Sequence, residues 1–182
     1  TTRGRDMSVL FGDGAGAAIL GPTSDEGRGV LSTHLYSDGA FAELLWCDLG
    51  GSAHRPRLAP EQLEQGLQFP QMVGREVFKH ASTRMPASVL EALKVNGLTV
   101  ADITLLIPHQ ANLRISEMVQ KQLGLRDDQI FSNIQRYGNT TAASIPIALD
   151  EALQAGRLAR GELLILTAFG SGFTWGSAAI RW

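Results

Sequence analysis

The chain has 182 residues, of which 44% are hydrophobic, and a formal net charge of −2 at pH 7. This length and apolar content suit a folded domain with a sizeable core and argue against disorder, while the near-zero charge argues against a general nucleic-acid or membrane-surface binder. A single cysteine excludes a disulfide framework and leaves no thiol pair for a zinc site, and no apolar run is long enough to span a membrane.

The first 40 residues are predicted to form two strands. Residues 7–20 hold two short apolar runs around a glycine cluster, which is typical of a buried strand with a tight turn. Residues 29–36 alternate between apolar and polar side chains, which predicts a second strand that pairs with the first. The glycines are spaced G-x-G-x-G and lead into no helix, so close backbone packing is a better interpretation than a phosphate loop.

Beyond a loop at 47–70, predicted helices and strands alternate. Apolar spacing predicts a helix over 71–96, which Pro86 should kink or restart. The later segments are, in chain order, a strand at 103–107, a helix at about 111–123, a short strand at 130–131, a helix at 141–154, a strand at 163–168 and a closing strand at 173–181. This order predicts an α/β architecture with a mixed, mostly parallel sheet, an antiparallel last strand and a buried helix at 141–154, which is apolar on nearly all sides.

Two glycine turns in the chain are similar to each other. Residues 11–19 and 169–180 both place a Phe-Gly-x-Gly turn between an apolar strand and a small-residue strand that ends in isoleucine. The simplest interpretation is a duplicated unit, of which the chain holds the tail of the first copy and the whole of the second. Chance similarity of glycine turns is the alternative.

Three strand-end turns carry hydrogen-bond donors. His109 follows a buried strand and precedes a helix, where α/β proteins form their sites, although a satisfied turn histidine is an alternative. Asn139 precedes another helix, which it can cap, or it can donate to an oxygen that gains negative charge. The glycines of the turn at 169–172 let a backbone N–H approach a reacting oxygen. The other histidines have no ligand-like spacing, so we expect no metal site.

The same turns carry the most specific motifs of the chain. They read Pro108-His109-Gln110-Ala111-Asn112-Leu113-Arg114, Tyr137-Gly138-Asn139-Thr140-Thr141 and Ala168-Phe169-Gly170-Ser171-Gly172. These motifs closely resemble those of the β-ketoacyl-[acyl-carrier-protein] synthase III family, and the likeness extends over nearly the whole chain, least in the loop at 47–70. The resemblance implies a thiolase-like fold of two similar halves around two buried helices. Residues 1–40 would be the closing strands of the first half, 41–70 a connecting loop and 71–182 the second half.

The resemblance also implies a Cys-His-Asn triad, to which this chain supplies His109 and Asn139. The family's nucleophilic cysteine lies in the first half, so we expect this chain to lack it and to be inactive alone; Cys47 stands in the wrong place. The implied reaction is a decarboxylative Claisen condensation of an acyl-CoA, usually acetyl-CoA, with malonyl-acyl-carrier protein, which initiates fatty acid synthesis without a permanently bound cofactor. His109 and Asn139 would hydrogen-bond the malonyl thioester oxygen, and the backbone N–H of Ser171 would contribute to an oxyanion hole.

Further contacts follow from the same likeness. The implied substrate-binding residues are Gly74, Ala111, Asn112 and Phe169, and the implied carrier-protein-binding residues are Gln110, Ala111, Asn112, Leu113, Arg114, Lys79 and Lys121. Solvated surface lysines are the alternative for Lys79 and Lys121. The family is a homodimer and cytoplasmic in bacteria, which we expect here, with the cysteine-bearing half as a further partner. Two other functions stay open: a synthase III-like acyltransferase of secondary metabolism and a non-catalytic carrier-protein-binding module.

Overall fold

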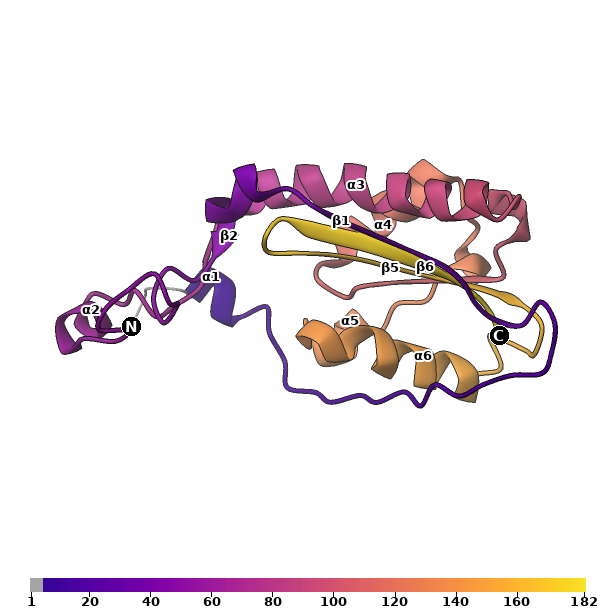
Figure 1. Ribbon diagram of the computed structural model, residues 1–182, viewed down its shortest axis with the longest axis horizontal. Coiled ribbons are helices and arrows are strands. Elements are labelled where there is room, and N and C mark those ends of the chain that lie inside the picture. The colour runs from indigo at the N-terminus through magenta and orange to yellow at the C-terminus, as the bar shows by residue number, and fades with distance from the viewer. Residues whose placement is uncertain (1–4) are drawn as a thin grey trace.

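The computed structural model describes residues 5–182 as a four-stranded sheet with helices on both faces (Figure 1). The strands are β1 (Gly29–Ser37), β4 (Leu105–Pro108), β5 (Leu163–Gly170) and β6 (Thr174–Arg181), in the order β1-β6-β5-β4. The sheet is mixed and its last strand antiparallel, as predicted, but it is not mostly parallel. Because β6 is inserted between β1 and β5, two of the three pairings are antiparallel, and β4 with β5 is the parallel one.

The pairing predicted between residues 7–20 and 29–36 is wrong. A short helix α1 (Arg5–Ser8) is followed by extended chain whose single ladder contact is a bridge between Phe11 and Asn139, and every residue from 13 to 27 is exposed. This segment runs beside α6 (Figure 1). β1 instead finds its hydrogen-bonding neighbour in β6, within the sheet that also holds β4 and β5. The division of the chain at residues 40 and 70 stays a prediction.

The glycine cluster packs closely, as predicted. A Cβ atom on Gly12 would lie 2.0 Å from the carbonyl oxygen of Tyr137, and one on Gly16 would lie 2.5 Å from Cγ of Pro146. Side chains at these positions would push the segment away from the turn that carries Asn139. The glycines therefore allow residues 10–16 to support that turn.

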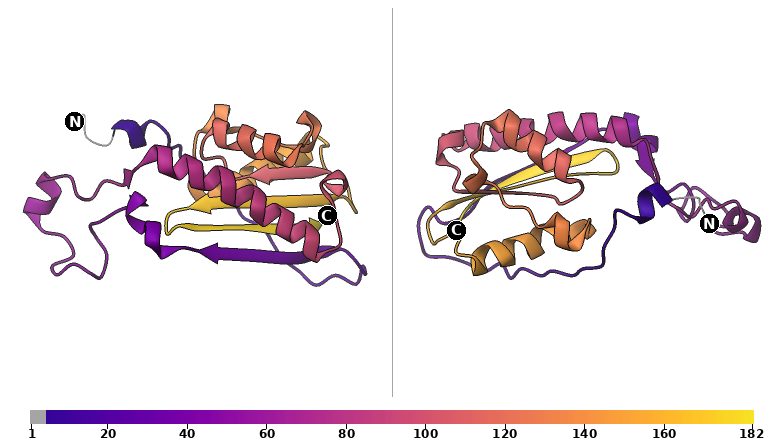
Figure 2. Two further views of the ribbon diagram at one scale, coloured as in Figure 1. Left: turned by 90° about the horizontal axis from the view of Figure 1, so that it is seen from above. Right: turned by 180° about the vertical axis from the view of Figure 1, so that it is seen from behind.

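The main helices are α3 (Gly74–Val95), α4 (Leu113–Leu123), α5 (Ile134–Tyr137) and α6 (Ser144–Gln154). Helix α3 continues through Pro86, so this proline does not restart it. Viewed from above, α3 crosses the sheet and α4 lies beside it, towards the β4 edge (Figure 2). The shorter elements are η1 (Gly39–Leu44), β2 (Leu45–Trp46), α2 (Pro60–Glu64), β3 (Gln71–Met72), η2 (Val100–Asp102), η3 (Asp127–Gln129) and η4 (Thr141–Ala143).

The sheet separates two cores. Alternate side chains of a strand point to opposite faces, so Leu106 and Ile165 pack under α3 and α4, whereas Leu105, Ile107 and Leu164 pack on α6. The predicted strand at 130–131 is reduced to a bridge between Ile130 and Leu106.

Helix α6 is buried on one side. Ala148 and Ala152 are fully buried against the sheet, whereas Ile145 and Ile147 are half-buried. On its other side, α6 is contacted by the extended segment at 13–17, which is itself exposed to solvent. The prediction of a helix buried on nearly all sides is therefore wrong, because α6 is buried only on the side that faces the sheet.

The segment at 47–70 extends away from the sheet and its helices (Figure 1). It contains α2 and pairs no residue with the main sheet in the part of the chain that the structure describes. None of the helices found between residues 5 and 182 has the length and apolar character needed to cross a bilayer.

Candidate active site

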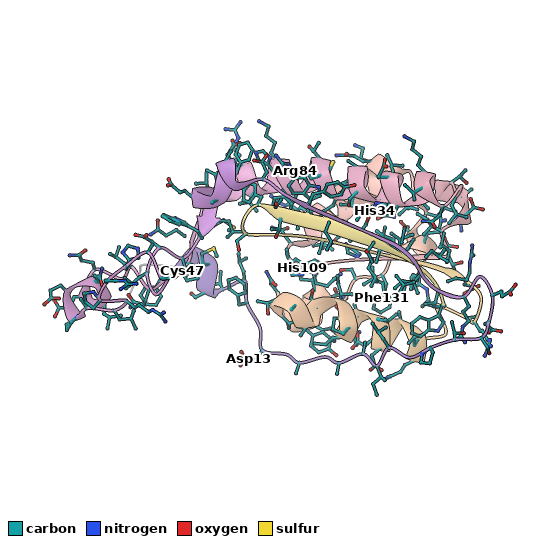
Figure 3. The ribbon with its side chains drawn as sticks, in the orientation of Figure 1. Asp13, His34, Cys47, Arg84, His109 and Phe131 are labelled. Atoms are coloured by element: carbon teal, nitrogen blue, oxygen red, sulfur yellow. The ribbon has the colours of Figure 1, made fainter. Side chains whose placement is uncertain are left out.

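The three predicted turns converge on one open, mostly apolar cavity of about 1490 Å³. His109, Asn139, Phe169 and Ser171 all line this cavity. His109 follows β4, Asn139 precedes η4 and α6, and the other two belong to the end of β5 and the turn after it. Figure 3 shows His109 between the sheet and the α6 layer. The topology thus brings together residues that lie up to about sixty positions apart in the chain.

His109 is held at both its backbone and its ring. Its backbone N–H donates to the carbonyl oxygen of Thr167 at 2.8 Å, which continues the parallel pairing of β4 with β5 by one residue. Its Nδ1 lies 2.6 Å from Oγ of Ser144, in the first turn of α6. Burial lowers the pKa of His109 below its usual value of 6.5, so the imidazole is neutral near pH 7.

Gln110 has a structural role that contradicts its predicted carrier-protein contact. Its side chain is 1% exposed and donates to the carbonyl oxygen of Pro108 at 2.6 Å. Its Oε1 accepts from Oγ of Ser132 at 2.7 Å and from the backbone N–H of Asn133 at 3.1 Å. A side chain with all these bonds inside the protein joins the His109 turn to the segment before α5, and it is not available to a partner.

Asn139 is oriented by its neighbours. Its Oδ1 accepts the backbone N–H of Thr141 at 2.9 Å, while its backbone exchanges hydrogen bonds with Leu10 and Gly12 at 2.8 and 3.0 Å. Because Oδ1 is occupied, Nδ2 is the group left to donate into the cavity. Thr141 takes a φ of +52°, which is unusual for a β-branched residue and allows this tight turn. Asn139 does not cap the following helix, since the N-cap residues of η4 and α6 are Thr140 and Ala143. Its Oδ1 closes the turn before η4, which leaves Nδ2 as a donor.

Glu151 anchors the Asn139 turn and was not foreseen from the sequence. Nδ2 of Asn133 donates to it at 2.8 Å, and Arg136 and the hydroxyl of Tyr137 also hydrogen-bond its carboxylate. Burial opposes ionisation of Glu151, but these bonds and the guanidinium charge hold its pKa below the usual value. The available signal was its spacing: Glu151 stands seven residues, or two turns, after Ser144 on the same face of α6.

Phe169 and Ser171 complete the cavity wall. Phe169 is 7% exposed and packs against Phe173, with ring centroids 4.8 Å apart. Ser171 is exposed in the β5–β6 turn, and its carbonyl oxygen accepts the Thr174 hydroxyl at 3.0 Å. This side of the cavity is therefore apolar up to the turn that carries the Ser171 backbone.

Most of the other predicted contact residues lie at or near the cavity mouth. Gly74, Ala111, Asn112 and Arg114 line it. Asn112 caps α4, because its Oδ1 accepts the backbone N–H of Arg114 at 3.0 Å. Outside the lining residues, the exposed positions predicted to meet a carrier protein are Leu113, Lys121 and Lys79.

Cys47, which the sequence places away from the family's nucleophile, is exposed and lines the cavity. Its thiol donates to the carbonyl oxygens of Leu49 and Gln68 at 3.4 and 3.3 Å. Figure 3 shows it on the side of the extended loop. A thiol held by two backbone carbonyls lacks the basic partner that activates a cysteine nucleophile.

The comparisons with known proteins all point to the same family. Residues 1–39 match the family model described as 3-oxoacyl-[acyl-carrier-protein (ACP)] synthase III, and residues 93–182 match the one described as its C terminal. A β-ketoacyl-[acyl-carrier-protein] synthase III of Roseiflexus sp. is 53% identical over 178 residues, which cover 98% of this chain and 53% of that protein. The chain thus spans about half the length of the curated relatives it matches.

Solved structures show the same thiolase fold. The crystal structure of 3-oxoacyl-[acyl-carrier-protein] synthase III from Aquifex aeolicus superposes with a TM-score of 0.85 at 39% identity, over 98% of this chain and 52% of that one. The priming β-ketosynthase from the R1128 polyketide biosynthetic pathway gives a TM-score of 0.81 at 32% identity, over 97% of this chain and 51% of that one. The sequence motifs and the fold therefore agree.

Proposed function

Since the chain belongs to the 3-oxoacyl-[acyl-carrier-protein] synthase III family, we propose that it supplies the histidine–asparagine half of a condensing active site. The complete enzyme is an acyltransferase that joins an acyl-CoA, in our proposal acetyl-CoA, to malonyl-acyl-carrier protein and so initiates fatty acid synthesis. The cysteine nucleophile comes from the portion of the family that lies outside this chain, and these residues alone are inactive. The coenzyme A thioester is a substrate, and no bound cofactor takes part.

The chemistry divides into loading and condensation. In loading, the cysteine thiolate attacks the acyl-CoA carbonyl, the carbon–sulfur bond to coenzyme A breaks and coenzyme A leaves as its thiolate. In condensation, the bond between the malonyl carbon and its carboxylate breaks, carbon dioxide leaves and the electron pair forms a thioester enolate. The enolate carbon then attacks the acyl-cysteine carbonyl, and the thiolate leaves to give the β-ketoacyl product.

His109 and Asn139 act on the enolate. Both donate to the malonyl thioester oxygen as negative charge develops there, and one such donor is typically worth about 10²- to 10³-fold in rate. The backbone N–H of Ser171 donates to the oxyanion of the acyl-cysteine addition step. Phe169 presents an apolar wall that disfavours the malonyl carboxylate and favours its loss.

The observation that supports this proposal is the orientation of the two donors beside one cavity. His109 binds Ser144 through Nδ1, and Asn139 binds the Thr141 N–H through Oδ1, so each side chain keeps one nitrogen for the cavity they both line. Two such groups from separate turns suit the stabilisation of one oxygen better than the chance convergence of a turn histidine and a helix cap.

Substrate and partner positions follow the same plan. The cavity mouth at Gly74, Ala111 and Asn112 would hold the pantetheine arm. Leu113, Arg114 and Lys121 on α4, with Lys79 on α3, would meet the acidic carrier protein. We propose a cytoplasmic homodimer, as in the family.

A chimera tests the proposal directly. The N-terminal portion of the Roseiflexus relative is joined to this chain in place of the 53% of that protein which the chain covers. We expect the chimera to condense acetyl-CoA with malonyl-acyl-carrier protein, and the same chimera with His109→Ala serves as the control. Binding of the carrier protein without condensation, in a chimera that still loads acetyl from acetyl-CoA, would support the non-catalytic alternative.

The secondary-metabolism alternative needs a different readout. The similarity to a priming ketosynthase of a polyketide pathway keeps it open. A panel of acyl-CoA donors separates the two, because a fatty-acid initiator should prefer acetyl-CoA whereas a secondary-metabolic enzyme should prefer another donor. The pocket that sets this preference is formed in part by the cysteine-bearing portion, so the panel is best run on the natural full-length protein.

A further inference from the structure

The hydroxyl of Ser144 lies at the junction of the two catalytic turns. Ser144 begins α6 and is 2% exposed. Its Oγ lies 2.6 Å from Nδ1 of His109 and accepts the backbone N–H of Gln110 at 3.3 Å. Within residues 5–182, these are the two hydrogen bonds found for this hydroxyl. The direction of the bond to His109 is therefore decided by where the hydroxyl proton can go.

Two arrangements are compatible with the positions of the atoms. In the first, the Ser144 hydroxyl donates its proton to Nδ1 of His109 and its oxygen accepts from Gln110, so every polar group is paired. In the second, Nδ1–H of His109 donates to Oγ, and the hydroxyl proton is left buried without an acceptor. An unpaired buried donor is costly, so the first arrangement is favoured.

Gln110 favours the first arrangement, because its backbone N–H occupies one lone pair of the Ser144 oxygen. Its side chain is fixed by Pro108, Ser132 and Asn133, so its backbone N–H is aimed at Oγ of Ser144 by a rigid turn. One lone pair of the hydroxyl oxygen is thus already used. The hydroxyl proton then points away from Gln110, towards the ring of His109.

We propose that Ser144 is a positioning residue that keeps the proton of neutral His109 on Nε2, which makes this nitrogen a donor to the cavity. This inference rests on the proposed function, in which His109 stabilises a thioester enolate. With Nδ1 turned to Ser144, Nε2 lies on the opposite side of the ring, and His109 lines the cavity. The other tautomer would present a lone pair to the thioester oxygen and repel its growing negative charge. Burial keeps the pKa of His109 low, so the ring has one N–H to place.

The tautomer can be observed without measuring turnover. The chimera is labelled with ¹⁵N-histidine, and long-range ¹H–¹⁵N NMR correlations are recorded near pH 7, where protonated and unprotonated ring nitrogens differ widely in shift. The His109 signals are those lost in a His109→Gln chimera. We expect Nε2 to be protonated and Nδ1 to be unprotonated. A protonated Nδ1 overturns the proposal, whether or not the chimera condenses its substrates.

Substitution then tests the dependence on Ser144. Ser144→Ala should lower the rate of malonyl decarboxylation by about 10- to 100-fold, because the ring loses its orientation but not its donor, while acyl loading stays unchanged. The matched control is Ser82→Ala on α3, which removes a buried hydroxyl that has no partner within the described residues and lies outside the cavity lining. Ser144→Thr, which keeps the hydroxyl, should restore most of the rate.

Each outcome has one interpretation. Equal rates for Ser144→Ala and Ser82→Ala overturn the positioning role. If Ser144→Ala does not fold, the tautomer of the parent chimera and the rate of Ser144→Cys, whose thiol is a weaker donor, decide instead: a protonated Nδ1 or an unchanged rate overturns the proposal. A parent chimera with Nε2 protonated that loads acetyl but does not condense contradicts the proposed function and leaves the tautomer assignment standing.

Discussion

At the scale of single residues, the site depends on side chains whose second polar atom is already used. Asn139 has Oδ1 on the Thr141 N–H, and His109 has Nδ1 at Ser144. Each residue is thereby fixed before substrate arrives, so little reorganisation is needed when charge develops. In the proposed reaction the two residues are preorganised donors, and the contribution of each can be measured separately.

The first prediction concerns His109. His109→Ala in the chimera should slow malonyl decarboxylation by at least about 10²-fold, because a donor to the enolate oxygen is lost, and it should spare acyl loading, which forms no enolate. Decarboxylation is followed by release of carbon dioxide from malonyl-acyl-carrier protein, and loading by transfer of radiolabelled acetyl to the protein. Normal decarboxylation in this variant would refute the assigned role.

The second prediction concerns Glu151 and pH. Its pKa is held below 4.5 in the folded protein, so its ionised form adds stability above about pH 4.5 that is lost as the pH falls through the folded value. Glu151→Gln should therefore lower stability near pH 7 by about 1 kcal/mol, since it weakens hydrogen bonds to a charged group. Thermal unfolding of the parent chimera and of its Glu151→Gln variant is measured from about pH 3 to about pH 7. The difference in stability between the two proteins should become smaller in acid.

A neighbouring carboxylate provides the control for Glu151. Asp150 is exposed and bonds Gln154 at 2.7 Å, away from the Asn139 turn. Asp150→Asn should change stability less than Glu151→Gln at every pH and should leave the condensation rate unchanged. If the stability difference between the parent chimera and Glu151→Gln is the same at every pH, the carboxylate charge does not stabilise the turn.

At the scale of the elements, the sequence predicts where helices and strands occur better than it predicts which of them lie side by side. The apolar side of residues 111–123 predicts α4, and the small and apolar residues of 141–154 predict α6. The partner of β1 could not be predicted in this way, because alternation shows that a strand has two faces but does not show which edge it joins. Pro86 is tolerated inside α3 because the helix is packed along its length on the sheet.

In the candidate site, the sequence likewise identified single residues better than their partners. The sequence motifs located His109 and Asn139, since His109 follows a strand and both residues stand shortly before a helix. Ser144, Glu151 and the internal role of Gln110 were missed because these partners lie 14 to 35 positions away in the chain. The side chains that orient a site are therefore visible only once the turns have been brought together.

The third prediction belongs to α4. Arg114 and Lys121 stand seven residues, or two turns, apart on this helix and are both exposed. The double charge reversal Arg114→Glu and Lys121→Glu should raise the KM for malonyl-acyl-carrier protein by about tenfold or more and weaken its salt dependence, because rim charges steer association. Acyl loading from coenzyme A should change little.

Charge reversal on α3 provides the matched control for α4. Lys94 lies in the last turn of α3, fifteen residues from Lys79 and hence about 22 Å along the helix axis. Lys94→Glu should leave the KM for the carrier protein unchanged. Equal effects of Lys94→Glu and of the α4 variant would indicate general electrostatics and not a docking surface.

At the scale of the whole molecule, several large apolar side chains are exposed to solvent. Ile19 is 99% exposed, Leu20 is 85% exposed and Leu35 on β1 is 84% exposed. Large exposed apolar side chains are typical of interfaces, so we propose that these residues meet the cysteine-bearing portion of the family. In the duplication predicted from the two glycine turns, residues 11–19 would belong to that portion, as the counterpart of residues 169–180.

The fourth prediction concerns the exposed segment that precedes β1. The segment at 13–21 is extended and exposed here, with no strand partner within residues 5–182. In the chimera it should join a sheet of the added portion, so its amide hydrogens should exchange at least about 10²-fold more slowly than in the chain alone. Hydrogen exchange followed by mass spectrometry measures this, with the loop at 50–57 as an internal reference that should exchange quickly in both. Equally fast exchange at 13–21 in a catalytically active chimera would contradict the duplicated architecture, because a strand of the first half cannot leave its backbone donors unpaired inside a closed fold.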